Sequence, residues 1–84
     1  MVAPVLVSMR EKFEDVRLGE MEYFESRLAS LSASDHELVE QLTKRLVAKL
    51  SHTPTVRLKE AAGSTRGTRM ADALRLLFDL DQPE

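Results

Sequence analysis

Apolar residues in the first third of the chain recur at steps of three and four, which is the period of an amphipathic helix. This stripe consists of Val5, Met9, Phe13, Val16, Phe24, Leu28 and Leu31. No alternation of period two competes with it, and Pro4 suits an opening helical turn. The pattern predicts one helix over residues 5–31. Gly19 costs a helix about 1 kcal/mol relative to Ala, so a bend near that position is the alternative to one straight helix.

Turn signals divide the rest of the chain into shorter helices. Ser34 and Glu37 form a capping box, which predicts a second helix over residues 35–51. Pro54 either stops this pattern or opens a third helix at its first position. The apolar side of the second helix is expected to contain Leu38, Val39, Leu42, Leu46, Val47 and Leu50.

The third helix is expected over residues 54–62, with Gly63 just past its C-terminus. After a loop over residues 63–67, Thr68 is expected to cap a last helix that ends near Asp79. Its inward residues are predicted to be Met70, Ala73, Leu74, Leu77 and Phe78, with Leu80 closing it. The predicted fold class is therefore all-α, with a long N-terminal helix followed by two to three shorter helices.

Size and composition exclude several classes of protein. A chain of 84 residues fits one small domain. The absence of cysteine excludes disulfide scaffolds, Cys-ligated metal sites and a thiol nucleophile. The longest apolar run, residues 5–7, is far short of the roughly 18 residues that span a bilayer, and no basic segment precedes it as in a signal peptide. We therefore expect a cytoplasmic location and no membrane partner.

The length of the first predicted helix also bears on self-association. Twenty-seven residues at 1.5 Å per residue give a helix of about 40 Å. A compact domain of this size has a diameter of roughly 30 Å, so the helix should extend beyond its own domain. Its apolar stripe then needs a cover, either a second copy of the chain or another part of a longer protein.

The formal net charge of −2 conceals a strong asymmetry along the chain. Residues 11–40 sum to −6, whereas residues 44–69 sum to +6. One interpretation is that an acidic helix faces a basic one, within one chain or across a dimer. The other is a basic surface for nucleic-acid phosphates. Composition alone favours the first, because charged stretches are usually solvated faces and no aromatic residues are interleaved with the bases.

No residue pattern in the sequence indicates an active site. His36 and His52 lack metal-ligating partners at the right spacing, and His52 is expected to cap the end of the second helix. Gly63 and Gly67 do not match a phosphate-binding loop. We therefore predict no catalytic, cofactor-binding or metal-ligating residue in this chain.

The segment from Thr43 to Lys59 resembles the C-terminal dimerisation domain of glutamyl-tRNA reductase. That family carries the pattern T-x-R-L-V-x-K-L-x-H-x-P-T-x-x-L-K in this domain. The matching residues are Thr43, Arg45, Leu46, Val47, Lys49, Leu50, His52, Pro54, Thr55, Leu58 and Lys59. Residues 73–80 are similar to the family's terminal A-L-x-x-L-F-x-L, and the resemblance extends over about residues 4–80. Ala48, Ser51 and Thr53 depart from residues common in the family.

The resemblance implies that the chain is a non-catalytic piece of a longer enzyme. Glutamyl-tRNA reductases reduce the glutamyl group of charged tRNA with NADPH to glutamate-1-semialdehyde, for tetrapyrrole synthesis. The catalytic cysteine and the NADPH-binding fold belong to preceding domains of that enzyme. The dimerisation domain pairs with its copy in a V-shaped homodimer and helps to hold tRNA. On this basis residues 1–84 are expected to form a single helical dimerisation domain, with about 4–80 ordered.

Two sets of candidate residues follow from these arguments. Ten apolar residues should be shared between the chain's own core and a dimer contact: Met9, Phe13, Val16, Phe24, Leu28, Leu42, Leu46, Leu50, Leu74 and Phe78. Six basic residues are candidates for contact with tRNA: Arg45, Lys49, Arg57, Lys59, Arg66 and Arg69. Alternatively, the bases serve helix packing, with Arg57 and Lys59 forming salt bridges to the acidic helix. A free-standing helical adaptor or RNA-binding module is the alternative to a reductase domain.

Overall fold

The computed structural model describes residues 2–80, and they form four helices. These are α1 (Ala3–Tyr23), α2 (Glu25–Leu28), α3 (Ala33–Glu60) and α4 (Thr65–Leu77). No strand occurs among the described residues, so the all-α prediction is confirmed. The N-terminal helix is long, as predicted, but with 28 residues α3 is longer than the 21-residue α1.

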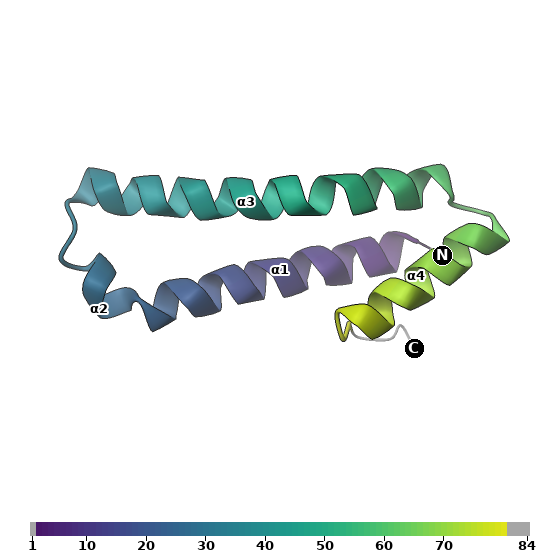
Figure 1. The fold of residues 1–84 in the computed structure, drawn as a ribbon, viewed down its shortest axis with the longest axis horizontal. Helices are drawn as coiled ribbons and strands as arrows, with labels where there is room; N and C mark the ends of the chain where they lie inside the picture. Colours follow the sequence, from purple (N-terminus) through teal and green to yellow (C-terminus); the bar gives the residue numbers. More distant parts are fainter. Residues whose placement is uncertain (1, 81–84) are drawn as a thin grey trace.

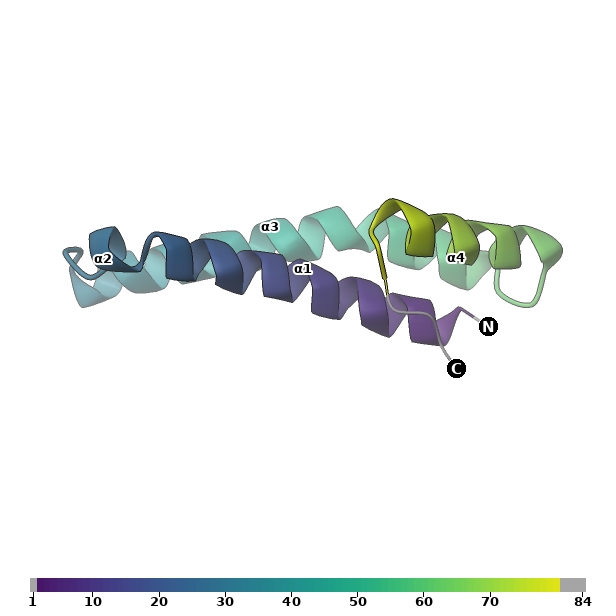
Figure 2. The same cartoon turned by 90° about the horizontal axis from the view of Figure 1, so that it is seen from below.

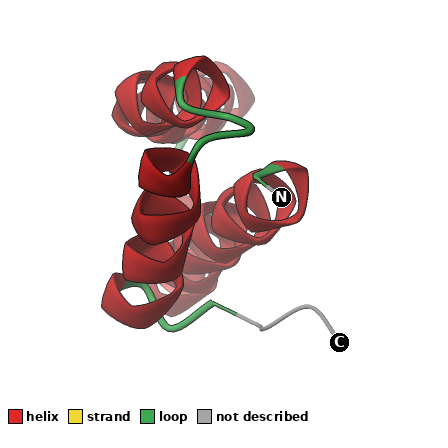
Figure 3. Cartoon of the chain, turned by 90° about the vertical axis from the view of Figure 1, so that its right-hand side faces the viewer, coloured by secondary structure: helices red, strands yellow, loops and turns green. Residues whose placement is uncertain are grey.

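The long helices α1 and α3 run side by side in opposite directions, with α2 at the turn between them (Figure 1). At the other end of this hairpin, α4 folds back beside α1 and α3 (Figure 2). Seen along its length, the molecule has α4 crossing the two long helices at that end (Figure 3). The principal extents are 50 × 22 × 16 Å, so the molecule is an elongated rod.

The hydrophobic core lies where three helices meet. It contains Val5, Leu6 and Met9 of α1, Leu58 of α3, Ala71 of α4, and Leu80 beyond α4. Val2, Phe13, Met70 and Leu74 pack against it as partly buried residues. All of these residues lie at the α4 end of the rod, because only there does a third helix cover the groove between α1 and α3.

The first helix is shorter than the sequence predicts. It ends at Tyr23, and the amide of Phe24 donates to the carbonyl of Glu20 at 3.1 Å before the short α2 begins. Gly19, near which a bend was possible, lies within regular helix and has open space around it. A single glycine costs too little to break a helix, whereas the chain must turn after Tyr23 to bring α3 back along α1.

The second and third predicted helices are one helix. α3 continues through Pro54 to Glu60, so the predicted break at Pro54 and the capping role of His52 were wrong. Buried Thr55, which donates to the carbonyl of Ser51 at 2.7 Å, and Leu58 pack this half of α3 into the core. This packing outweighs the roughly 3 kcal/mol that an internal proline costs a helix.

The helix caps also differ from the predictions. Ser32 caps α3, its hydroxyl accepting from the amide of Asp35 at 3.1 Å, so the capping box at Ser34 is not formed. Ser64 caps α4 in the same way, three residues before Gly67, so the prediction of Thr68 was wrong. In both cases the sequence contains several neighbouring hydroxyl residues that could serve as the cap.

Glycine is required at two places in the turn between α3 and α4. Gly63 adopts a φ of 82°, the left-handed conformation predicted there, although α3 ends earlier, at Glu60. Gly67 is buried, and a Cβ atom at this position would collide with the backbone carbonyl of Ala61. The first turn of α4 therefore lies directly against the end of α3. At its own end, α4 finishes with Asp79 at a φ of 51° and a hydrogen bond from the Leu80 amide to the Arg75 carbonyl at 2.9 Å.

The inward faces of two helices are shifted from the predicted positions. On α1 the row continues from Phe13 to buried Arg17, while Val16 is 56% exposed. On α4 the buried positions are Gly67, Ala71 and Arg75. The predicted inward residues Ala73 and Leu77 are exposed. Arg17 and Arg75 occupy the inward rows because their long apolar stems pack while their charged ends pair with a carboxylate on the same helix.

Candidate dimer interface

The two halves of the rod differ sharply in burial. We call residues 2–17 and 51–80 the packed end, and residues 18–50 the arm. Every buried residue that the structure describes belongs to the packed end, and residues 18–50 contain none. The arm consists of the adjoining parts of α1 and α3 joined through the four-residue α2, and no helix there covers the groove between the two long helices as α4 does at the packed end.

Large apolar side chains are nevertheless abundant on the arm. Those exposed to solvent are Leu18, Tyr23, Phe24, Leu31, Leu38, Leu42, Leu46 and Leu50. Four of them form a row on α3 at a spacing of four residues, which we call the leucine row: Leu38, Leu42, Leu46 and Leu50. Each is more than half exposed, and Leu50 reaches 71%. Such a contiguous row is typical of a surface that another protein covers.

The structure divides the ten apolar candidates between the core and this surface. Met9 is fully buried, and Phe13 and Leu74 are partly buried against the core. Phe78 packs edge-on against Phe13, with ring centroids 5.2 Å apart, and is 38% exposed. Leu28 is half-buried. The candidates that are exposed and do not pack against the core are Val16, Phe24, Leu42, Leu46 and Leu50.

Sequence reasoning places Leu38 inward on its helix and omits it from the interface set. The structure exposes 63% of its surface, and it begins the leucine row. Its four-residue spacing from Leu42 is the signal that could have identified it. Leu76 and Leu77 of α4 are also about four-fifths exposed, and neither is among the interface candidates.

The overall dimensions support an incomplete fold. The Cα radius of gyration is 15.8 Å, whereas a compact chain of this length has about 12 Å. The accessible surface is 6490 Å², against roughly 5,000 Å² for a compact monomer of this mass. The difference between these two accessible surface areas is larger than the roughly 800 Å² that each partner buries in a standard protein–protein interface.

A charged cluster joins α1 to α3 where the arm begins. Buried Arg17 donates through Nε to Glu14 at 3.0 Å and through a terminal nitrogen to the hydroxyl of Thr43 at 3.4 Å. This hydrogen-bonded pairing lowers the pKa of Glu14 and raises the pKa of Arg17. The cluster therefore links Arg17, the last packed-end residue of α1, to Thr43 in the arm segment of α3.

Ion pairs among residues 2–80 all lie within single helices. They are Arg17 with Glu14, Arg57 with Glu60, and Arg75 with Asp72, each three residues apart. The expected salt bridges from Arg57 and Lys59 to the acidic helix are not among them. Among residues 2–80, no ion pair at contact distance therefore joins the acidic region to the basic region, although Lys44 lies close enough to Glu14 to help lower the pKa of that carboxyl.

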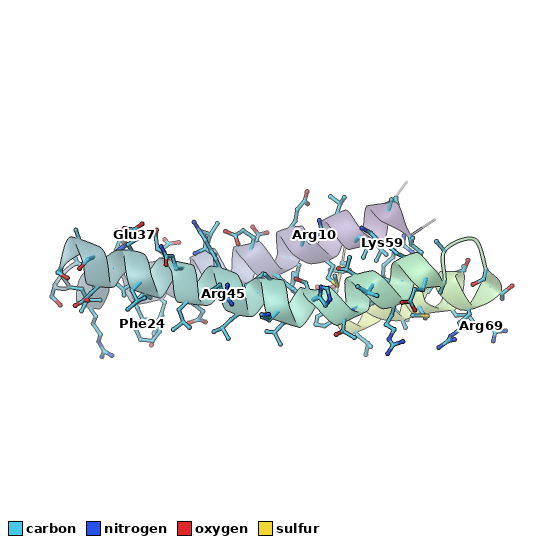
Figure 4. The ribbon with its side chains drawn as sticks, turned by 90° about the horizontal axis from the view of Figure 1, so that it is seen from above. Arg10, Phe24, Glu37, Arg45, Lys59 and Arg69 are labelled. Atoms are coloured by element: carbon cyan, nitrogen blue, oxygen red, sulfur yellow. The ribbon has the colours of Figure 1, made fainter. Side chains whose placement is uncertain are left out.

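The six basic candidates for tRNA contact are all exposed. Figure 4 shows Arg45 midway along α3, while Lys59 and Arg69 lie near the end of the rod where α3 and α4 meet. Arg57 and Arg66 line one recess at that corner, together with Glu60. The six therefore do not form a single cluster, and two of them share a recess.

Other predicted features can be placed as well. His36 lies in the first turn of α3, and His52 is exposed in the interior of that helix. Within residues 2–80 no group of three or more His, Asp or Glu side chains is placed to hold a metal ion. The helices of this described region are all too short or too polar to cross a membrane.

This architecture, a helical hairpin with a core at one end and an uncovered apolar arm at the other, is that of a helical association module. The profile of the family described as "Glutamyl-tRNAGlu reductase, dimerisation domain" matches residues 1–80. The chain belongs to this family. The resemblance found in its sequence pattern is therefore confirmed, and the chain is a dimerisation domain of this family.

Curated relatives agree with this assignment. The chain is 44% identical over 81 residues to a glutamyl-tRNA reductase of Streptomyces coelicolor and 46% identical over 79 residues to one of Frankia alni. A glutamyl-tRNA reductase of Streptomyces avermitilis is 40% identical over 80 residues. These alignments cover 94–96% of this chain but only 14–17% of each relative. No solved structure gave a significant match.

Proposed function

We propose that this chain holds two copies of a glutamyl-tRNA reductase together, and that the contact is made by the arm. The observation that carries the proposal is the leucine row, which lies uncovered on a part of the fold that has no buried residue. The family name supports pairing with a second copy. A homodimer with two-fold symmetry uses the same patch on both chains, so each leucine contributes twice.

The energetics fit a stable dimer. Full burial of a leucine side chain is worth about 1.5–3 kcal/mol relative to full exposure. The leucine row is more than half exposed in one chain, so its burial from both copies offers several kcal/mol of association free energy. The charged residues on either side of the row would form the polar rim of such an interface.

A matched pair of substitutions tests the location of the contact. Leu46 in the arm and Val7 in the packed end have nearly equal exposure, 54% and 55%. Leu46→Glu should abolish the dimer mass measured by light scattering, because it places a charge in the buried centre of the contact. Val7→Glu should leave it dimeric. A wild-type chain that is monomeric at high micromolar concentration, or a dimeric Leu46→Glu variant, would overturn the proposal.

For the whole enzyme, we propose the reaction that the relatives' name describes, reduction of glutamyl-tRNA, with NADPH as reductant and glutamate-1-semialdehyde as product. The described residues do not fit a dinucleotide: they form no strand, and no glycine-rich turn follows a strand into a helix. Other parts of the reductase would therefore bind NADPH and substrate. The contribution of this chain is to fix the spacing of two such catalytic units, and dimer-breaking variants of the full enzyme test that role.

A second candidate function is contact with tRNA through the six basic residues. Its supporting observation is that all six are exposed and that Arg57 and Arg66 line the same recess. Phosphate contacts release counterions, so affinity for tRNA should fall steeply with salt. Arg66→Gln should reduce the slope of log affinity against log salt by about one unit, whereas Arg27→Gln in the arm should leave it unchanged. Absent or salt-independent binding of tRNA to the chain would exclude this function.

A further inference from the structure

A recess lies between α1 and α3 on a part of the surface that the leucine row does not reach. Its volume is about 430 Å³, within the range of roughly 300–1,000 Å³ that is typical of small-ligand sites. Arg10 of α1 and Lys44 and His52 of α3 are among the residues that line it. No residue of α4 and no member of the leucine row does so. The recess is therefore separate from both the third helix and the proposed contact surface.

Cationic side chains from both long helices meet at this recess. Lys44 and His52 lie eight residues apart on α3, about 12 Å along its axis, and Arg10 lines the recess from α1. All three are exposed. Figure 4 shows Arg10 on α1, between Arg45 and Lys59 along the rod. A ligand in the recess could therefore reach positively charged groups on two opposite walls.

The chain does not neutralise this charge by contact. Glu14 is the one acid among the described residues that line the recess, and Arg17 already donates to it through Nε at 3.0 Å. Arg10 and Lys44 take part in none of the ion pairs found among residues 2–80. A cleft lined by charges of one sign concentrates ions of the opposite sign. The recess is therefore suited to an anion.

The hydroxyl groups of the recess narrow the class of ligand further. Buried Ser51 and Thr55 donate within α3, to the carbonyls of Val47 and Ser51 at 2.6 and 2.7 Å. Because these hydroxyl protons are already used, the side-chain donors left for a ligand belong to the cationic residues. A phosphate group only accepts hydrogen bonds when it is ionised, and it presents oxygens in several directions. It can therefore bond to both walls at once, and arginine and lysine commonly bind it.

We propose that the recess binds a phosphate group between Arg10 of α1 and Lys44 and His52 of α3. The phosphate belongs either to a free polyphosphate or nucleotide or to the backbone of tRNA, and for tRNA the inference rests on the second candidate function. None of the three residues is among the six basic candidates from the sequence. The sequence gives no signal for this site, because Arg10 and Lys44 are brought together only by the hairpin of α1 and α3.

Binding of tripolyphosphate and of tRNA to the chain, each at constant ionic strength, tests the site and identifies the source of the phosphate. Lys44→Gln should weaken binding of tripolyphosphate about tenfold, because one hydrogen bond from a charged group is lost. Arg10→Gln, on the other wall, should have the same effect. Lys49→Gln is the matched control, since Lys49 is also exposed on α3 but does not line the recess, and it should change this affinity by less than about twofold.

The source follows from which probe responds. Tripolyphosphate binding that is weakened by Lys44→Gln and not by Lys49→Gln supports a site for free phosphate compounds. If only tRNA binds, weakening by Lys44→Gln, with Arg27→Gln in the arm as the control, supports a site for the nucleic-acid backbone. Circular dichroism of each variant should show unchanged helix content, so that a loss of binding reports on the site and not on the fold.

Two results would overturn the phosphate site. One is that neither probe binds; the other is that Lys44→Gln and Lys49→Gln weaken tripolyphosphate binding equally, which is a diffuse effect of charge. If tRNA affinity falls in Arg66→Gln but in neither Lys44→Gln nor Arg10→Gln, and tripolyphosphate does not bind, the recess is excluded while the tRNA contact stands. A monomeric wild type that still binds tripolyphosphate in the recess would overturn the proposed dimer and leave this inference in place.

Discussion

The packed end and the arm use the same two helices for different purposes. In the packed end, α4 covers the groove between α1 and α3, and Met9 and Leu58 become completely or almost completely buried. In the arm the same helices continue without a third, and no residue is buried. The difference is one of covering elements and not of hydrophobicity, because large apolar side chains make up about a third of the residues in both regions.

A third helix therefore decides which apolar residues stabilise the monomer and which remain for association. Leu58 and Leu42 belong to the same helix, yet their exposures are 1% and 57%. Arg17, the last packed-end residue of α1, is hydrogen-bonded to Thr43, which lies in the arm segment of α3. We infer that the packed end stabilises the single chain, whereas the arm is completed only by a second copy.

The largest expected effect contrasts these two leucines. Leu58→Ala should lower the free energy of unfolding by about 2–5 kcal/mol, because it opens a cavity in the core. Leu42→Ala should change it by less than about 1 kcal/mol in dilute, monomeric solution, while weakening the dimer. Urea denaturation measures the first quantity and light scattering the second. Equal losses of monomer stability would show that the arm has a core of its own.

A smaller effect is expected at two glycines on either side of the boundary. Gly67→Ala should destabilise the chain by about 1–3 kcal/mol, because the added Cβ collides with the carbonyl of Ala61. Gly19→Ala should stabilise it by about 0.5–1 kcal/mol, since the site is an exposed helix interior with open space around it. Thermal unfolding of both variants checks this. A tolerated Gly67→Ala would mean that α4 is not held tightly against α3.

The smallest expected effect is a pH dependence of the free energy of unfolding, which arises from the pair of Glu14 and Arg17. Because Arg17 lowers the pKa of Glu14 in the folded chain, the pair contributes stability above the unfolded glutamate pKa of about 4.3. That contribution is lost as the pH falls through the lower folded pKa. The stability difference between the wild type and Glu14→Gln should therefore shrink in acid, as denaturant titrations at several pH values can measure. A difference that stays constant with pH would show that the ion pair contributes nothing.

The sequence predicts the helical class because its apolar period of three to four has no competitor over most of the chain. It misplaces the helix ends because these depend on tertiary packing. Pro54 should end a helix by local propensity, but Thr55 and Leu58 pack the following turns into the core and keep α3 continuous. Ser32 and Ser34 could both cap α3, and Ser64 and Thr68 could both cap α4, so local sequence does not decide between the members of either pair.

The sequence is enough to predict that the chain has an apolar association surface, but not which residues form it. A long apolar stripe needs a cover, and this property of the sequence is enough to predict self-association. The stripe itself does not say where α4 will lie, so Met9 and Leu50 look equivalent in the sequence and differ completely in the fold. The charge asymmetry is likewise visible in the sequence. The three-dimensional arrangement is needed to show that no ion pair at contact distance joins its two halves among residues 2–80.

Amide hydrogen exchange below and above the dimer dissociation constant tests the central claim most directly, because it reports on the two regions separately. In the monomer, amides of α3 over residues 33–50 should exchange faster than those near Leu58. When the dimer forms, protection over residues 33–50 should rise strongly, with a smaller change in the packed end. Protection of the arm that is the same in monomer and dimer would contradict the account.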